Sequence, residues 1–304
     1  MQYHDLGKTG FKISSVFYGG VVSSKHFDKA VMPGDGQAHS DAFVGWAIDH
    51  GINYFDVAPA YGDAQQLLGN SLVPYRKDVY LACKTTERLR EGAEKELMES
   101  LRLLHTDYFD IYQMHGITTM EDIEQAFGPG GIMELMVEMQ KKGVIRQIGF
   151  TAHGEKAALK AIEMFDFASV LFPVNWHMHM AHGMAGTLIP AAKAKGMGVL
   201  GMKSMIERAW DEEERYSSKY PKSWCKPFDI DEEPEMLKAA VRYTLSLGVD
   251  SIVPPGNFDH FKFAVENIDE LLAHPITDEE KAMLAARLEL VKDRPFLDAA
   301  TYTL

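Results

Sequence analysis

The feature that most constrains the fold of this chain is a regular alternation of short apolar runs with longer helical patterns. Most of the runs are continuously apolar, which is typical of strands covered on both faces in a parallel sheet. The first residues of most successive apolar runs are separated by roughly 25–35 residues, the length of one strand–helix unit. The expected strands are Ser15–Gly19, Asn53–Val57, Val79–Lys84, Phe109–His115, Ile145–Thr151, Ser169–Asn175, Gly198–Lys203 and Ser251–Pro254.

Eight such units predict an α/β fold of the (β/α)8 TIM-barrel class, formed by one domain over residues 1–304. A doubly wound open sheet would need fewer strands and a switch point. A β-hairpin is expected before the barrel, over Tyr3 to Ser14, and an extra helix near the C-terminus, over Thr277–Lys292. The helices expected between strands are Ser40–His50, Gly92–Leu104, Met133–Lys142, Glu155–Phe165, Thr187–Lys195 and Glu233–Leu247.

The segment that connects the last two expected strands is longer than the other connections, because it contains an insertion at about residues 205–232. This segment is charged but also rich in aromatic residues. Because it follows the carboxyl end of a strand, it belongs on the face of a barrel where active sites lie. We expect it to form a lid or a wall of a substrate site, the alternative being a surface loop.

Composition excludes several classes of function. The chain has 31 Lys and Arg against 44 Asp and Glu, a net charge of −13, which argues against nucleic acid or an anionic membrane surface as a partner. Its two cysteines, Cys83 and Cys225, fit a reducing compartment better than a disulfide framework. The sequence shows no secretory leader pattern and no long apolar run. We expect a cytoplasmic protein with a small-molecule partner; the oligomeric state stays open.

Polar residues at three consecutive strand ends suggest a catalytic site. Asp56 ends the second expected strand and Tyr61 follows it, Lys84 ends the third, and His115 ends the fourth. Each of these residues alone is compatible with an ordinary structural role. In a barrel of this class, however, the carboxyl ends of neighbouring strands meet at one rim, so the four side chains are expected to lie together.

These four residue types suit the transfer of a proton to a carbonyl oxygen. Tyrosine is a poor acid, with an ordinary pKa of about 10, but an adjacent Lys84 ammonium would lower the pKa of Tyr61. Asp56 would neutralise the buried lysine, and His115 would orient the substrate oxygen. A proton on the oxygen is useful only if a hydride reaches the carbon. Because no side chain donates hydride, a nicotinamide cofactor is implied.

With these motifs the sequence resembles the aldo-keto reductase family over nearly its whole length. The resemblance rests on the Tyr3 to Ser14 segment, on Gly51 to Gly62 followed by Leu68-Gly69, on the segments that contain Lys84 and His115, and on Gly143 to Phe150. It implies a barrel that binds NADP or NAD without a Rossmann fold. It also implies reduction of an aldehyde, ketone or sugar carbonyl, or oxidation of the alcohol, with a catalytic tetrad of Asp56, Tyr61, Lys84 and His115, in which Tyr61 is the acid.

The resemblance also implies cofactor contacts, at Gly20, Asp56, Thr151, His153, Asn175, Met202, Lys203, Gly256, Asn257, Lys262, Glu266 and Asn267. The nicotinamide end departs from the family pattern. The usual Ser-Asn pair after strand five is Thr151-Ala152 here, with His153 as a substitute, and the usual Gln of strand six is Leu171. Met202 or Trp176 would replace the tyrosine that often stacks on the nicotinamide ring.

The adenosine end does not favour NADP over NAD. An alignment through Glu266-Asn267 places Asn257 and Phe263 where the family usually has cations for the 2′-phosphate. Lys262 and His260 could replace those cations, whereas Asp259 would repel a phosphate.

Substrate contacts are expected at Trp176, His177, Trp210 and Trp224. His177, His179 and His182 are close enough in sequence to suggest a metal site, but no cysteine or clearly placed carboxylate accompanies them, and we expect none. Two other functions stay open. One is a catalytically weak nicotinamide-binding sensor or interaction subunit on the same barrel, suggested by Ala152 and Leu171. The other is a metal-dependent hydrolase or isomerase that uses the histidines.

Overall fold

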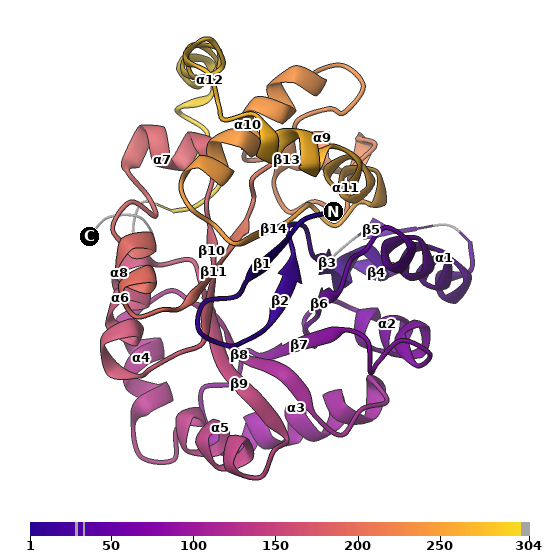
Figure 1. Cartoon of the computed structure of the whole chain (residues 1–304), viewed down its shortest axis with the longest axis vertical. Helices are drawn as coiled ribbons and strands as arrows, with labels where there is room; N and C mark the ends of the chain where they lie inside the picture. The colour runs from indigo at the N-terminus through magenta and orange to yellow at the C-terminus, as the bar shows by residue number, and fades with distance from the viewer. Residues whose placement is uncertain (28–29, 33, 299–304) are drawn as a thin grey trace.

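The predicted barrel is present in the computed structural model of the chain, which describes residues 1–27, 30–32 and 34–298 (Figure 1). Eight parallel strands follow one another around the sheet in chain order. They are β3 (Tyr18–Gly19), β6 (Tyr54–Asp56), β7 (Tyr80–Thr85), β8 (Phe109–Ile117), β9 (Ile145–Ala152), β10 (Ser169–Pro173), β11 (Gly198–Met202) and β14 (Ser251–Val253). A parallel bridge between Val16 and Ile252 joins the two ends of the sheet, and the Phe17 amide donates to the Ile252 carbonyl at 3.0 Å.

All eight predicted strands occur, and the predicted fold class is confirmed. The first is shorter than predicted because it begins at Tyr18, and the last because it ends at Val253, where its pairing with β11 stops. β8 and β9 instead continue past their predicted ends, where Ile117 pairs with Ala152. The strand repeat therefore located every element of the barrel wall, while hydrogen-bond pairing determined where each strand ends.

Helices surround the sheet (Figure 1). The six predicted between strands occur as α1 (Gly36–Asp49), α3 (Arg90–Leu103), α5 (Ile132–Lys141), α6 (Glu155–Met164), α8 (Leu188–Ala194) and α10 (Pro234–Ser246). The predicted C-terminal helix is α12 (Asp278–Val291). Four further helices were not predicted: α2 (Ala64–Leu72), α4 (Met120–Phe127), α7 (Trp176–His182) and α11 (Phe258–Ala273).

The predicted start of the first helix, at Ser40, is wrong. α1 begins four residues earlier, after Asp35, whose side chain accepts a hydrogen bond from the Gln37 amide at 2.9 Å and caps the helix. Ser40 is buried within the helix, and its hydroxyl bonds to Ser23 and Ser71 at 2.9 and 2.8 Å. Both Asp and Ser are good capping residues, so only tertiary contacts distinguished them.

The predicted N-terminal hairpin, formed by β1 (Tyr3–Asp5) and β2 (Lys12–Ser14), lies across one end of the barrel (Figure 1). Leu6 and Ile13 are buried there against the inward side chains of Phe17, Tyr54 and Leu200. The hairpin fills the end at which the strands begin. The opposite end, where the strands finish, is left for a pocket.

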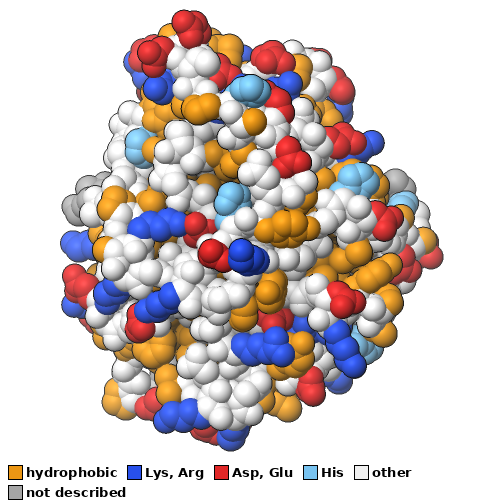
Figure 2. Space-filling view, in the orientation of Figure 1, with side chains coloured by type: hydrophobic (Ala, Val, Ile, Leu, Met, Phe, Trp, Pro, Cys, Tyr) orange, Lys and Arg blue, Asp and Glu red, His pale blue; other side chains and the backbone are white. Residues whose placement is uncertain are grey.

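Within residues 1–27, 30–32 and 34–298, no helix is long and apolar enough to cross a membrane. On the hairpin face, acidic and basic side chains are interspersed (Figure 2).

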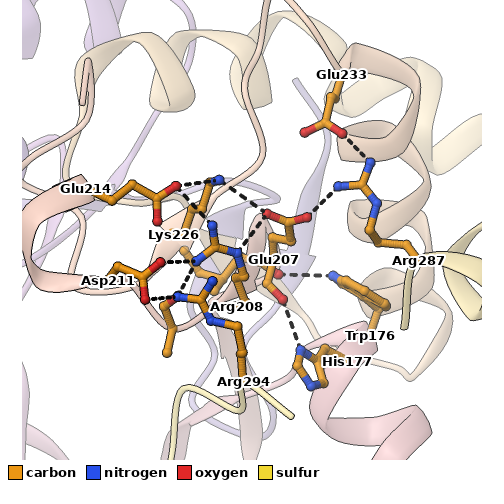
Figure 3. A network of polar contacts seen from close by, with 12 residues as sticks. Trp176, His177, Glu207, Arg208, Asp211, Glu214, Lys226, Glu233, Arg287 and Arg294 are labelled. Atoms are coloured by element: carbon orange, nitrogen blue, oxygen red, sulfur yellow. Dashed lines mark hydrogen bonds and ion pairs between the residues drawn. The ribbon is translucent and has the colours of Figure 1, made fainter. Parts of the chain in front are cut away.

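The insertion contains β12 (Ile206–Arg208), α9 (Glu212–Ser217) and β13 (Lys226–Pro227), and a network of ion pairs joins it to α12 (Figure 3). At its centre lies Glu207, only 4% exposed, whose carboxylate contacts Arg287 of α12. Arg208 Nε and Lys226 Nζ lie 3.7 and 3.9 Å from the same carboxylate, and Arg287 also pairs with Glu233. These contacts fix the insertion against the outside of the barrel.

We expect Arg287→Met to lower the free energy of unfolding by about 1–2 kcal/mol, because it removes the nearest cation from a buried carboxylate, while partial exposure weakens the loss. Urea denaturation measures the change. Arg102→Met is the matched control, since Arg102 pairs with Glu99 on an exposed face of α3, and its unfolding midpoint should match that of the wild type. Equal midpoints for all three proteins would show that Arg287 does not hold the insertion in place.

Candidate active site

The four predicted catalytic side chains line one pocket at the carboxyl ends of the strands. Asp56 comes from β6, Tyr61 from the turn that follows it, Lys84 from β7, and His115 from β8. Loops cover the pocket, with Phe27 after β3 and Trp224 in the insertion. The structure therefore brings together residues that are 59 positions apart at most, 115 − 56, because three neighbouring strands end at the same level.

Lys84 and Asp56 form a buried ion pair at the floor of the pocket. Lys84 is fully buried, Asp56 is 3% exposed, and the ammonium contacts one carboxylate oxygen. The other oxygen accepts a hydrogen bond from Gln113 Nε2 at 2.7 Å. Gln113 was not among the predicted site residues, although it precedes His115 by two positions on β8 and so shares its face of the strand.

Tyr61 lies against this ion pair, with the Lys84 ammonium 5.4 Å from the centroid of its ring. Its ring also meets those of His115 and Trp224 at centroid distances of 5.7 and 5.8 Å. The following residue, Gly62, has φ +60°, and a Cβ there would lie 1.8 Å from the His26 carbonyl oxygen. Only glycine therefore allows the segment before Phe27 to approach the turn that presents Tyr61.

The electrostatics of the pocket keep Tyr61 protonated and His115 neutral. Burial raises the pKa of the Tyr61 phenol above 10.0, and the Lys84 ammonium opposes that shift. The effect of Lys84 has the predicted direction, but burial outweighs it in the net shift. Burial and the nearby Lys84 charge together hold the pKa of His115 well below 6.5. Tyr61 is thus available as a proton donor at neutral pH, and His115 as an uncharged hydrogen-bonding group.

Lys84 remains an ammonium in this pocket. Burial alone would lower its pKa, but the charge of the Asp56 carboxylate and its hydrogen bond outweigh that effect, so that the pKa of Lys84 is raised above 10.5. A permanent positive charge next to Tyr61 stabilises the phenolate that would form when the phenol gives up its proton.

Six of the expected cofactor contacts line this pocket: Asp56, Thr151, His153, Met202, Lys203 and Gly256. Gly20 lies between Gly19 and Val21, which both line it, and Asn257 lines a neighbouring second pocket. Of the other four, Lys262, Glu266 and Asn267 lie along α11 and line neither pocket. Lys262 and Glu266 are 3.7 Å apart, and Asn267 Nδ2 donates to the Phe263 carbonyl.

Asn175 and three residues expected to contact substrate do not line the pocket, because their polar atoms bond to main-chain carbonyls in the insertion or next to it. The Asn175 side chain caps α7 and donates to the carbonyls of Lys203 and Ile206. Trp176 and His177 are fully buried and bond to the carbonyls of Ile206 and Glu207 at 3.0 Å each (Figure 3). Trp210 Nε1 donates to the Ser223 carbonyl at 2.8 Å. Trp224, half-exposed, is the tryptophan that reaches the pocket.

The histidines after β10 do not form a metal site. His177 bonds to the Glu207 carbonyl and His179 to the Tyr243 hydroxyl, in different directions. Within the part of the chain that the structure describes, no three His, Cys, Asp or Glu residues are grouped so that they could hold a metal ion. The histidine cluster therefore does not support the metal-dependent alternative.

The pocket has hydrogen-bonding groups and charges that suit a nicotinamide cofactor. Among the described residues, the buried Nδ1 atoms of His115 and His153 and the Nδ2 of Asn257 have no hydrogen-bond partner. Burial lowers the pKa of His153 to about 3, so its ring is neutral and can both donate and accept. Lys203 also lines the pocket and is half-buried, with its ammonium 3.5 Å from Cys225 Sγ. Unpaired buried groups of this kind are expected where a ligand supplies the partners.

Comparisons with known proteins agree with this geometry. A model of the Aldo/keto reductase family matches residues 36–251. The chain is 26% identical over 185 residues to the uncharacterized oxidoreductase YqkF of Bacillus subtilis, an alignment that covers 56% of this chain and 55% of YqkF. It therefore spans about half of that relative's length. It is also 26% identical over 317 residues to L-galactose dehydrogenase of Arabidopsis thaliana, covering 95% of this chain and 94% of the relative.

Among solved structures, the chain is similar to aldo-keto reductase AKR11C1 from Bacillus halodurans in its holo form, with a TM-score of 0.67 and 21% identity. That superposition covers 94% of this chain and 96% of the other, and it shows the shared barrel fold. The match to the family model extends over more than half of the chain, and this chain therefore belongs to the Aldo/keto reductase family.

Proposed function

We propose that this protein transfers a hydride between NADPH or NADH and the carbonyl group of an aldehyde, ketone or sugar, with Tyr61 as the proton donor. The observation that carries the proposal is the buried Lys84–Asp56 ion pair beneath Tyr61, in a pocket that also contains His115. A lysine held at 0% exposure beside a tyrosine is costly to maintain. Its charge is useful to a phenol that gives up a proton.

Each of the four residues has a distinct part in the proposed reaction. The nicotinamide cofactor, when bound, supplies the hydride. Tyr61 donates its phenolic proton to the carbonyl oxygen, and Lys84 stabilises the phenolate that remains. Asp56 keeps Lys84 charged and in position, while Gln113 orients Asp56. The neutral His115 hydrogen-bonds the substrate oxygen and so aligns it with Tyr61.

The nicotinamide half of the cofactor would be held by Thr151, His153, Met202 and Lys203. Ala152 and Leu171 cannot hydrogen-bond through their side chains, so the neutral His153 ring is the group available for the carboxamide. The Gly256–Asn257 segment would hold the other half, as Asn257 faces the second pocket with an unpaired Nδ2.

The rim of the pocket supports substrates with an extended apolar face. The rings of Phe27 and Trp224 are 4.8 Å apart and stand beside Tyr61. Aromatic side chains of this kind pack well against flat rings and against the C–H face of a sugar. The similarity over 95% of the chain to a protein named L-galactose dehydrogenase makes sugars the first substrates to test.

Single-turnover spectroscopy tests the proposal. Purified protein loaded with each reduced dinucleotide is mixed with a panel of sugars, aldehydes and ketones, and we expect the reduced-nicotinamide absorbance band to disappear with at least one of them. Binding of a dinucleotide without oxidation by any carbonyl compound would instead favour the sensor or interaction subunit. Absence of binding by either dinucleotide would refute both.

A further inference from the structure

Cys225, in the insertion just before β13, is a thiol in the wall of the catalytic pocket that the proposed reaction does not use. The residue is 6% exposed and lines the pocket beside Trp224. Lys203, which directly follows β11, places its ammonium 3.5 Å from Cys225 Sγ. A cation this close stabilises negative charge on sulfur, and the thiolate is the form of cysteine that attacks electrophiles.

An imidazole with an unpaired nitrogen accompanies this pair. The Nδ1 of His153 is buried in the same pocket and has no hydrogen-bond partner among the described residues. Burial and the Lys203 charge lower the pKa of His153 to about 3, so the Lys203 charge acts on His153 as well as on Cys225. A nucleophile, a cation and an unpaired polar group that share one pocket indicate a site for a ligand.

The main chain fixes the position of Lys203. Its φ of +70° lies in the left-handed region that residues other than glycine rarely adopt. Such a conformation persists only where surrounding contacts determine it. Here the Lys203 carbonyl accepts hydrogen bonds from Asn175 Nδ2 at 2.8 Å and from the Ile206 amide at 3.0 Å. The side chain therefore starts from a fixed point at the edge of the pocket.

The segment that carries Cys225 is fixed as well. The Ser223 hydroxyl donates to the Cys225 carbonyl at 2.6 Å. Lys222, which lines both the catalytic pocket and the second pocket, donates to the carbonyls of Val22 and Ser24 at 2.9 and 2.7 Å. Because these contacts hold the segment against the barrel, the sulfur faces the pocket before any ligand binds.

The other cysteine of the chain has a different environment. Cys83 lies on β7, is fully buried and does not line the pocket. Burial raises the pKa of its thiol to about 11, so almost none of it is ionised at neutral pH. Its sulfur accepts a hydrogen bond from Gln65 Nε2 at 3.4 Å. The two cysteines thus provide an internal comparison between a pocket thiol and a core thiol.

We propose that Cys225 is a covalent modification site for carbonyl compounds in which a C=C bond is conjugated to the carbonyl group. The choice of electrophile rests on the proposed function, since carbonyl compounds are the proposed ligands of the pocket. The sulfur forms a C–S bond to the β-carbon, and the C=C electron pair moves to the α-carbon. The α-carbon takes up one proton, in place of the proton that the thiol loses. No group leaves, and nothing is oxidised or reduced.

The product is a thioether that occupies the pocket beside Trp224. Conjugated aldehydes and ketones are therefore inactivators of this protein, because the adduct blocks the space that a substrate needs. Saturated aldehydes and ketones are not, since they have no electrophilic β-carbon. Lys203 is a positioning residue that acts through the Cys225 sulfur and is not itself modified.

Peptide mapping by mass spectrometry tests the proposal in the full chain. The protein is incubated at neutral pH with N-ethylmaleimide, a conjugated cyclic carbonyl compound, and adduct formation is followed at each cysteine. We expect Cys225 to be modified about tenfold faster than Cys83, or more. This comparison is made within the wild type, so it stays valid even if a substitution in the pocket prevents folding.

Variants separate the contributions of the two side chains. Cys225→Ala should abolish the fast labelling, and Cys83→Ala, the matched control, should keep it. Lys203→Met should slow the labelling of Cys225 about tenfold, and Lys203→Arg, which keeps the charge, should slow it less. Labelling is measured without added dinucleotide, so that a contact between Lys203 and the cofactor does not enter the result. Thermal unfolding checks that each variant is folded.

A matched pair of aldehydes tests the chemistry of the adduct. trans-2-Hexenal has the conjugated bond and hexanal does not, so we expect a Cys225 adduct with hexenal alone. Equal modification by both aldehydes would show reaction of an amine at the carbonyl carbon and would overturn the proposal.

Equal labelling rates at Cys225 and Cys83 would also overturn it, and an unchanged rate in Lys203→Met would remove Lys203 from it. These results would leave the proposed function standing, because carbonyl reduction is measured separately through the reduced-nicotinamide absorbance. Absence of reduction with every carbonyl compound would refute the proposed function, while the labelling rates could still be measured. The two failures are therefore distinguishable.

Discussion

Tyr61→Phe is expected to reduce kcat/KM for carbonyl reduction about 10²–10⁴-fold, because it removes the group that protonates the substrate oxygen. Phenylalanine keeps the ring that packs against His115 and Trp224. The dinucleotide affinity, measured by tryptophan quenching, should therefore stay close to that of the wild type. A loss in turnover without a loss in cofactor binding is the signature of a group that acts on the reacting atoms.

Tyr54→Phe provides the control for this experiment. Tyr54 lies on β6, two positions before Asp56, and is fully buried. Its hydroxyl has no hydrogen-bond partner among the described residues, so its removal should leave the kinetics unchanged. If Tyr61→Phe retained the kcat/KM of Tyr54→Phe, another group would have to be the proton donor.

Lys84→Met is expected to lower the free energy of unfolding by about 3–5 kcal/mol, because it leaves the buried Asp56 carboxylate with only the Gln113 amide as a partner. Urea denaturation at neutral pH measures the change. Asp56→Asn combined with Lys84→Met removes both charges, and we expect this double variant to be more stable than Lys84→Met alone. That result would show that the destabilisation of Lys84→Met comes from the unpaired Asp56 carboxylate.

The double-mutant cycle separates this explanation from simple loss of packing. If Lys84 contributed only its aliphatic chain, Asp56→Asn and Lys84→Met would have additive effects on the free energy of unfolding. Additivity would contradict a buried ion pair at this position. A double variant that is more stable than Lys84→Met but inactive would show that the pair is kept for catalysis.

The barrel could be predicted because its signal is repetitive. Each strand is covered on both faces and so is continuously apolar, and eight copies of the same pattern leave few other folds. The catalytic residues could be predicted for a related reason. Once the strand ends are known, Asp56, Lys84 and His115 must meet, because parallel strands finish at one edge of the sheet.

The substrate wall could not be predicted in the same way. Trp176, His177, Trp210 and Trp224 are similar residues in or near the same insertion, yet only Trp224 lines the pocket. The other three bond to main-chain carbonyls of Ile206, Glu207 and Ser223. Which indole or imidazole faces a pocket depends on which carbonyls a loop leaves unpaired, and loop conformation has no sequence period.

The sequence by itself determined the barrel and the set of residues at its strand ends, since both follow from local periodicity and from the geometry of parallel strands. Only the tertiary structure decided three other properties. They are the net shift in the pKa of Tyr61, the hydrogen bond that Gln113 donates to Asp56, and the position of Lys222, which lines two pockets. These properties depend on burial and on contacts between segments up to 200 positions apart. Burial and long-range contact arise when the chain packs, and no local pattern of residues records them.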